Sequence, residues 1–407
     1  MKRDSLTSRR DFLRIGTTAI AGAALFPSGA CAPQSNKKTQ KDRKYVCRTL
    51  GRTGLRLPVV SMGSCYAIDL VRTALEKGIV YIHTSSGYSE QNHERLLGEV
   101  FRDRRRDSFV IATSPDLPYP SGRRGGRSLG LGRDVNPELI GESIEGSLGR
   151  LGLDYVDIYY LCSISSRDVT LFEPYMKAFE RLKKDRKTRF VGIGTHENEP
   201  EVIRAAAESG VWDVVLTAYN FRQSHREEVR SAIHEAAKAG LGVVAMKTQA
   251  GVYWDRGRAE KINMKAALKW VLQDKNVHTT IPAFSNYDEM EEDLAVMADP
   301  TLTPEEKRDL ELGEELGFSG HYCQQCRRCV AQCPEGMDIP TLMRSYMYAF
   351  GHRRPKKARD TLRSWTSSQI GCKSCTMCEV TCSLGFDVRS RALDIARILE
   401  VPEEFLG

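Results

Sequence analysis

The sequence lacks the charge surplus of a nucleic-acid-binding protein once its N-terminus is set aside. Its formal net charge is +7, but residues 1–44 hold ten Lys and Arg against three Asp. Residues 45–407 therefore carry 50 basic and 50 acidic side chains. Without a basic footprint we expect no nucleic acid among the partners. The composition, 41% hydrophobic and 28% charged over 407 residues, indicates ordinary folded protein of two or three domains.

A long apolar run is also missing near the N-terminus. Residues 15–26 are uncharged, but this run of twelve is shorter than the roughly 20 residues that a membrane-spanning helix needs. It follows Arg9 and Arg10 and precedes the small residues Ser28 to Ala30. Basic, then apolar, then small residues is the order of an export signal. The paired arginines before Phe-Leu resemble a twin-arginine (Tat) signal, so we expect export by that route.

Cys31 follows this signal directly and leaves two processing routes open. A cysteine at this place resembles a lipoprotein attachment site, although Ser28 stands where that pattern has a larger apolar residue. Cleavage after Ala30 or Ala32 by the ordinary peptidase is the alternative. We therefore expect a periplasmic protein, or one tethered to the membrane by lipid on Cys31.

Eight of the twelve cysteines fall into two runs of the form C-x2-C-x2-C-x3-C. In two-cluster ferredoxins the first three cysteines of a run bind one cluster and the fourth binds the other. The sequence therefore predicts two [4Fe-4S] clusters. The expected ligand sets are Cys323, Cys326, Cys329 with Cys382, and Cys372, Cys375, Cys378 with Cys333.

Zinc and disulfide bonds are the alternatives for these cysteines. Structural zinc sites use two separated pairs of ligands, so a third evenly spaced cysteine would have no role. Disulfides suit an exported protein but do not account for the same spacing twice. A predicted helix at residues 339–350 lies between the runs, and this insert resembles the α-helical ferredoxins. The basic stretch at residues 352–357 is either a solvated face or a docking patch for an acidic redox partner protein.

Between the signal and the cysteine runs, short apolar segments alternate with helical periodicity. Eight such units over about 240 residues predict a (β/α)8 TIM barrel, an α/β fold. A doubly wound open sheet is the alternative, but no G-x-G-x-x-G motif follows any strand. The expected strands are residues 59–61, 79–83, 109–113, 155–161, 190–194, 214–216, 242–246 and 279–282.

Five segments within residues 47–297 resemble the aldo/keto reductases and stand in the order that this family has. They are residues 48–57, 193–196, 218–220, 242–247 and 281–294. The cysteine runs that follow resemble the ferredoxin-tailed branch of the family. This resemblance implies a barrel that reduces carbonyls with NADPH through an Asp-Tyr-Lys-His tetrad.

Only one member of that tetrad is present. Tyr88 stands where the family has its catalytic tyrosine, whereas His83 replaces the Asp, Ser114 the Lys and Cys162 the His. A tyrosine without a neighbouring Lys has a pKa near ~10 and is a poor proton donor at neutral pH. His83 can act as an acid or base near neutrality, and with Cys162 it would form a base–nucleophile pair. We expect negligible NADPH-dependent reduction of simple aldehydes.

The resemblance also assigns residues to nucleotide binding. They are Tyr219, Asn220, Lys247, Ser285 and Asn286. In the family the segment at residues 285–290 holds the adenosine phosphate, usually with a basic residue nearby, but here it is acidic and would repel a 2′-phosphate. The resemblance therefore implies NADP(H) as the nucleotide, whereas the acidic side chains of this segment oppose its binding. The loop at residues 121–133 carries four arginines and would attract an anionic substrate.

Together these observations predict an exported iron–sulfur oxidoreductase that couples a small carbonyl or alcohol, for example a sugar, to electron transfer through two clusters. The alternative is a non-catalytic electron-transfer or binding subunit with a vestigial barrel. The expected domains are a signal at residues 1–32, a polar linker at 33–46, the barrel at 47–300, a connecting helix at 301–320 and a mainly α-helical dicluster domain at 321–407.

Overall fold

The computed structural model describes residues 45–118, 131–251, 261–315, 322–363, 365–375 and 378–406. The predicted export signal, Cys31, nearly all of the linker and most of the arginine-rich loop lie outside the described residues. Within the part of the chain that is described, no helix has the length and apolar character needed to cross a bilayer.

The central sheet has seven parallel strands in sequential order from β3 to β9. They are β3 (Tyr81–His83), β4 (Val110–Thr113), β5 (Val156–Leu161), β6 (Thr188–Thr195), β7 (Val214–Ala218), β8 (Gly242–Met246) and β9 (Thr279–Thr280). The first predicted strand, at residues 59–61, is present only as parallel bridges, which join Val60 to Thr280 and the adjoining Met62 to Ile82. These bridges link the last strand to the first, so the sheet curls into the predicted barrel.

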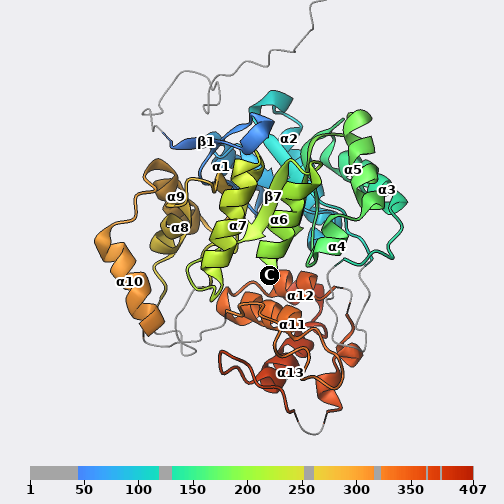
Figure 1. The fold of residues 1–407 in the computed structure, drawn as a ribbon, viewed down its shortest axis with the longest axis vertical. Helices are drawn as coiled ribbons and strands as arrows, with labels where there is room; N and C mark the ends of the chain where they lie inside the picture. Colours follow the sequence, from blue (N-terminus) through green and yellow to red (C-terminus); the bar gives the residue numbers. More distant parts are fainter. Residues whose placement is uncertain are drawn as a thin grey trace, which may run out of the picture. The chain divides into compact units, whose positions relative to one another are not determined.

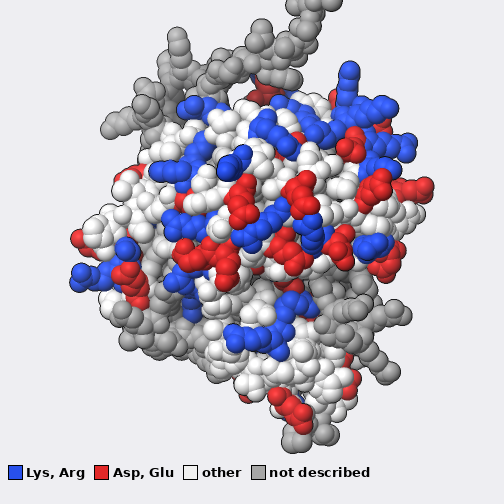
Figure 2. Space-filling view, in the orientation of Figure 1, with Lys and Arg blue, Asp and Glu red and all other residues white. Residues whose placement is uncertain are grey.

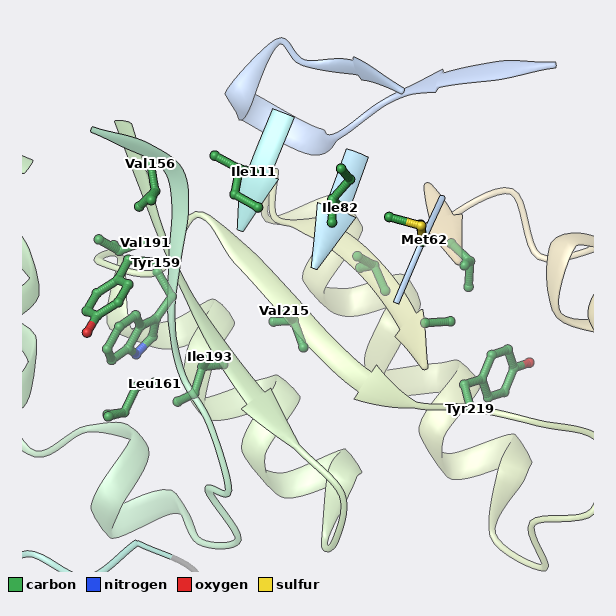
Figure 3. Close-up of a cluster of buried hydrophobic side chains, with 14 of the residues drawn as sticks. Met62, Ile82, Ile111, Val156, Tyr159, Leu161, Val191, Ile193, Val215 and Tyr219 are labelled. Carbon is green, nitrogen blue, oxygen red and sulfur yellow. The ribbon is translucent and has the colours of Figure 1, made fainter. Parts of the chain in front are cut away.

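A short hairpin of β1 (Cys47–Thr49) and β2 (Arg56–Pro58) lies beside the N-terminal ends of the strands (Figure 3). At its turn Gly51 has a φ of +48°, and a Cβ there would lie 2.3 Å from the backbone nitrogen of Gly242. Only glycine permits this close approach. The hairpin thereby covers the end of the barrel that lies opposite the strand C-termini.

Helices pack around the outside of the sheet, and α6 and α7 cover β7 (Figure 1). The helices are α1 (Ile68–Glu76), α2 (Asn92–Phe101), α3 (Glu138–Leu151), α4 (Arg167–Thr170), α5 (Glu173–Lys184), α6 (Glu199–Ser209), α7 (Arg226–Lys238), α8 (Met264–Leu272) and α9 (Tyr287–Ala298). Basic and acidic side chains are interspersed over the surface of this layer (Figure 2), as the absence of net charge outside the N-terminus leads one to expect.

Strand alternation decides which side chains face the barrel axis. Ile82 belongs to the large core between sheet and helices (Figure 3). Tyr81 belongs to the smaller cluster inside the barrel, where its hydroxyl lies 3.2 Å from that of Tyr160. The same two-residue period turns His83, at the end of β3, back toward the axis.

The C-terminal part is mainly helical, as predicted. Its helices are α10 (Pro304–Glu315), α11 (Ile339–Tyr346), α12 (Pro355–Thr361) and α13 (Val388–Ile398). The helix predicted at residues 339–350 is α11 together with a π-helical turn, η5 (Met347–Gly351). One hydrophobic cluster joins Phe221 and Ala266 of the barrel to Tyr322 and Leu342 of this part, so the two domains share buried apolar surface.

Candidate active site

A cavity of about 880 Å³ lies at the C-terminal ends of the barrel strands, where (β/α)8 enzymes build their active sites. The four predicted catalytic residues all line it, together with Lys247 after β8. The C-terminal domain forms the opposite wall. That wall includes Arg344, Tyr348, His352, Arg354, Lys357, Asp360, Arg363 and Trp365. The structure therefore brings the four candidate residues to one cavity.

Tyr88 stands in the short turn η3 (Tyr88–Gln91) after β3. The ammonium group of Lys357 lies 3.4 Å from the centroid of its ring, and this cation–π contact involves the ring face. Burial raises the pKa of Tyr88 above its ordinary value. At neutral pH this phenol is therefore a weaker proton donor than a tyrosine in water.

His83, Ser114 and Cys162 form a largely uncharged part of the cavity. Burial lowers the pKa of His83 to about 3. Burial raises the pKa of Cys162 to about 11, although a hydrogen bond with Ser114 opposes the shift. At neutral pH the imidazole is neutral and the thiol is protonated, so the base–nucleophile pair considered from the sequence is not in its reactive state. The Nε2 atom of His83 is buried and has no hydrogen-bond partner within the described residues.

Sequence reasoning missed Tyr348, a tyrosine contributed by the C-terminal domain. Lys247 donates a hydrogen bond to its hydroxyl oxygen. Burial raises the pKa of Tyr348, but the positive charges of Lys247, Lys357 and Arg344 outweigh burial and lower it to about 8. Burial, reinforced by Lys247, also lowers the pKa of Lys357 to about 8. The cavity thus holds a tyrosine and a lysine that both titrate near neutrality.

The only signal for Tyr348 in the sequence was the basic stretch that follows it. We expected residues 352–357 to form a solvated face or a docking patch, but the structure places His352, Arg354 and Lys357 in the cavity wall. Lys356 lies on the same helix and pairs with Glu403 instead. The stretch therefore serves largely as a contact surface for the barrel.

Ion pairs hold the C-terminal domain over the strand ends. Arg363 pairs with Asp116 and donates a hydrogen bond to the Gly87 carbonyl, 2.7 Å away. Arg327 pairs with Glu197, which is also part of the cavity wall. These contacts fix the position of the wall that carries Tyr348.

The two sets of cysteines predicted from the sequence line two separate small cavities. Cys323, Cys326, Cys329 and Cys382 line one, and Cys333, Cys372, Cys375 and Cys378 line the other. Each cavity thus receives its fourth cysteine from the other run. Thiolates are the ligands that iron–sulfur clusters take, and no group of His, Cys, Asp or Glu among the described residues is arranged for a single metal ion.

Comparison with known families agrees with both halves of this architecture. Residues 59–266, about half of the chain, match the profile of the aldo/keto reductase family. The chain belongs to this family. Residues 322–387 match a 4Fe-4S dicluster domain. The protein is therefore an aldo/keto reductase barrel joined to an iron–sulfur domain.

Individual aldo/keto reductases resemble the barrel but not the whole chain. L-galactose dehydrogenase from Arabidopsis thaliana is 26% identical over 298 residues, which cover 63% of this chain and 89% of that protein. L-glyceraldehyde 3-phosphate reductase from Escherichia coli O157:H7 is 24% identical over 325 residues, 64% of this chain and 89% of that protein. The solved aldo-keto reductase of Bacillus halodurans, in its holo form, has the same fold, with a TM-score of 0.53 at 20% identity over 66% of this chain and 96% of that one.

In this aldo/keto reductase the residues assigned to nucleotide binding make other contacts. Asn286 caps α9 by accepting a hydrogen bond from the backbone nitrogen of Glu289, and Ser285 donates to the carboxylate of Glu289. That carboxylate lies 3.0 Å from the guanidinium of Arg354 in the C-terminal domain. Residues 285–290, the acidic segment that the family resemblance assigns to the adenosine phosphate, are thus contacted by the C-terminal domain through Arg354.

Two of the other three residues of the nucleotide set, Tyr219 and Asn220, do not line the cavity. Tyr219 is buried against Trp270 in the core between sheet and helices, with 5.2 Å between ring centroids (Figure 3). Asn220 donates hydrogen bonds to the carbonyl of Lys247 and to the hydroxyl of Tyr322. Of the five residues in the set, only Lys247 lines the cavity.

Proposed function

We propose that this protein is an exported iron–sulfur oxidoreductase that interconverts a hydroxyl and a carbonyl group on a small substrate, for example a sugar. The electrons pass to or from two [4Fe-4S] clusters. The cavity carries this proposal, because barrel residues form one wall and the dicluster domain forms the other. A substrate bound there contacts both domains at once.

The electron count suits two clusters. Oxidation of one hydroxyl to a carbonyl releases two electrons and two protons, and reduction of a carbonyl consumes the same number. Two clusters, each accepting or donating one electron, would together take up or supply the two electrons of one turnover. An external redox partner protein is then the final acceptor or the initial donor.

The cysteines that line the two small cavities are the proposed cluster ligands. Their crossed arrangement follows the ferredoxin pattern. One set is Cys323, Cys326, Cys329 and Cys382, and the other is Cys372, Cys375, Cys378 and Cys333. The four-thiolate composition of each set favours iron–sulfur chemistry over a hard oxygen-binding metal.

Two observations favour the clusters over NADP(H) as the source or sink of electrons. The barrel segment at residues 285–290 brings carboxylates to the place where a 2′-phosphate would bind, and Arg354 already pairs with Glu289 there.

A sugar substrate is supported by the polar side chains of the cavity wall and by the relative named L-galactose dehydrogenase.

The proposal is tested by mixing anaerobically purified protein with a panel of aldoses, alditols and ketoses and recording the visible absorbance of the clusters. We expect at least one sugar to bleach or restore this absorbance without any nucleotide. Lys247→Met, in the cavity, should slow the change, whereas Lys77→Met, which removes a surface pair with Glu291, should not. If no sugar changes the absorbance of either the oxidised or the reduced clusters, the alternative of a non-catalytic binding or electron-transfer subunit is favoured.

A further inference from the structure

Tyr348 stands on an unusual piece of backbone. Helix α11 ends at Tyr346 and passes directly into the π-helical turn Met347–Gly351. Single π-turns of this kind are rare and are frequently found at functional sites. The turn places the Tyr348 side chain, only 9% exposed, in the wall of the cavity.

Lys247 approaches Tyr348 from the barrel. Its ammonium group donates a hydrogen bond to the Tyr348 hydroxyl oxygen. The backbone of Lys247 has a φ of +58°, a left-handed conformation that costs free energy for a residue with a side chain. The amide of Asn220 holds this backbone by donating to the Lys247 carbonyl, 3.1 Å away. A strained residue held in this way is typical of a site whose geometry serves function.

The charged and titratable groups around Tyr348 come from both domains. They are Lys247 after β8, Lys357 on α12, Arg344 on α11, His352, whose ring centroid lies 6.0 Å away, and the barrel tyrosines Tyr66 and Tyr88. Within the described residues none of the three cations forms an ion pair with a carboxylate. Asp360 and Glu197, also in the cavity wall, lie within electrostatic range of Lys357 and Arg344, respectively. The phenolate form of Tyr348 is the negative charge that Lys247, Lys357 and Arg344 stabilise together.

Tyr88 lacks this arrangement. The ammonium group of Lys357 lies over the face of its ring, where it does not donate a hydrogen bond to the hydroxyl. Ser114, which stands at the position of the family lysine, brings no positive charge. Burial consequently dominates and raises the pKa of Tyr88.

We propose that Tyr348, supplied by the iron–sulfur domain, is the catalytic residue that exchanges a proton with the substrate oxygen. This assignment deepens the proposed function and rests on it. In the reducing direction the carbonyl takes up two electrons, which the clusters would supply, and two protons. The O–H bond of Tyr348 breaks and a new O–H bond forms on the carbonyl oxygen, solvent water supplies the proton of the new C–H bond, and Lys247 and Lys357 balance the phenolate charge. In the oxidising direction the phenolate takes the hydroxyl proton, the C–H proton passes to solvent water, and the two electrons would pass to the clusters. Lys247 and Lys357 are positioning residues, because they act through Tyr348.

A titration that needs no substrate tests the ionisation of Tyr348. Tyrosinate absorbance of the cluster-loaded protein is recorded against pH as a difference spectrum. We expect one tyrosine to ionise near pH 8, as the lowered pKa of Tyr348 requires. Tyr348→Phe should remove this step, Lys247→Met should move it to higher pH, and Tyr346→Phe, a control on the same helix, should leave it in place. A step that is absent from the wild type, or that survives Tyr348→Phe, overturns the proposal.

A second measurement connects the ionisation to the reaction. With the sugar that changes cluster absorbance fastest, Tyr348→Phe should lower the rate by about 10²–10⁴-fold and abolish its pH dependence near 8, with cluster content unchanged. Tyr88→Phe should keep that pH dependence. If Tyr88→Phe abolishes the pH dependence and Tyr348→Phe does not, Tyr88 is the proton donor and the proposal is wrong. If no sugar reacts, the proposed function fails, and the titration still decides whether Tyr348 ionises as we infer.

Discussion

At the residue scale, environment decides what the remaining and replaced tetrad positions can do. His83 and Cys162 titrate readily in water, but burial moves the pKa of His83 to about 3 and that of Cys162 to about 11. Both are therefore uncharged at neutral pH. The same cavity lowers the pKa of Tyr348 to about 8, because three cations face it. Cations from both domains thus lower the pKa of this one phenol in the cavity.

One prediction at this scale concerns stability. Asp157 in β5 is 1% exposed and accepts hydrogen bonds from Arg106, Arg189 and the backbone of Ile111, at 2.7, 2.7 and 2.9 Å. Asp157→Ala leaves two arginines without their buried partner, so the free energy of unfolding should fall by about 3–5 kcal/mol. Circular dichroism in increasing urea measures the change.

A matched control for Asp157 is Glu145→Ala. Glu145 also pairs with a cation, Lys187, but its side chain is 57% exposed. Loss of this surface pair should cost no more than about 1 kcal/mol. An equal decrease in the free energy of unfolding for the two variants would show that the buried ion pairs of Asp157 stabilise the barrel no more than an exposed pair does.

The sequence predicted those site residues whose places follow from local pattern. His83 ends a strand, Ser114 and Cys162 each come directly after one, and parallel strands bring their C-terminal ends to one edge. Tyr348 and Lys357 could not be found in this way. They reach the cavity because one domain packs on the other, and no periodicity in either domain encodes that contact.

At the scale of elements, the alternation of apolar segments with helical periodicity was sufficient to predict the barrel. The spacing of the cysteines was sufficient to predict the dicluster domain. The strands begin and end within a few residues of their predicted bounds. The first predicted strand is present as isolated bridges at Val60 and Met62, with further backbone hydrogen bonds from Ser61 to Thr280 and from Gly63 to Pro282. The π-turn after α11 could not be predicted, because its residues 347–351 have ordinary helical character.

A prediction at this scale concerns the crossed cysteines. Cys333 belongs to the first run but lines the cavity of the second. Cys333→Ala should therefore damage the cluster held by Cys372, Cys375 and Cys378 and leave the other intact. Electron paramagnetic resonance of the reduced protein distinguishes the two clusters.

The control for the crossed arrangement is Cys65→Ala. Cys65 is buried in the core of the barrel and lines neither of the small cavities, so both clusters should keep their full occupancy. If Cys333→Ala instead removes the cluster that begins at Cys323, each run binds its own cluster and the crossed assignment is wrong.

At the scale of the whole molecule, the barrel and the iron–sulfur domain pack against each other around the cavity. They share a hydrophobic cluster, and the pairs Arg363–Asp116, Arg354–Glu289 and Arg327–Glu197 connect them. The contacts surround the cavity rather than a remote face. This arrangement gives a physical reason for joining an aldo/keto reductase barrel and an iron–sulfur domain in one chain.

The proposed export concerns the whole chain, because the twin-arginine route carries proteins that have already folded around their cofactors. Replacing Arg9 and Arg10 with Lys should leave the cluster-loaded protein in the cytoplasm, since the receptor reads the paired arginines. Cell fractionation and immunoblotting measure the distribution. Normal export of the double variant would remove the twin-arginine interpretation. Mass spectrometry of the exported N-terminus then shows whether Cys31 carries lipid.

If the proposed function is correct, electrons from a substrate in the shared cavity enter the clusters. An anaerobic experiment that counts the cluster electrons and the carbonyl product in the same sample tests this. Oxidised protein is mixed with the reactive sugar alcohol, reduced clusters are quantified by electron paramagnetic resonance, and the carbonyl product is quantified by mass spectrometry. We expect two cluster electrons for each carbonyl formed, with no nucleotide present. Product that forms only with added NADP⁺, while the clusters stay oxidised, would show that the substrate's electrons do not enter the clusters.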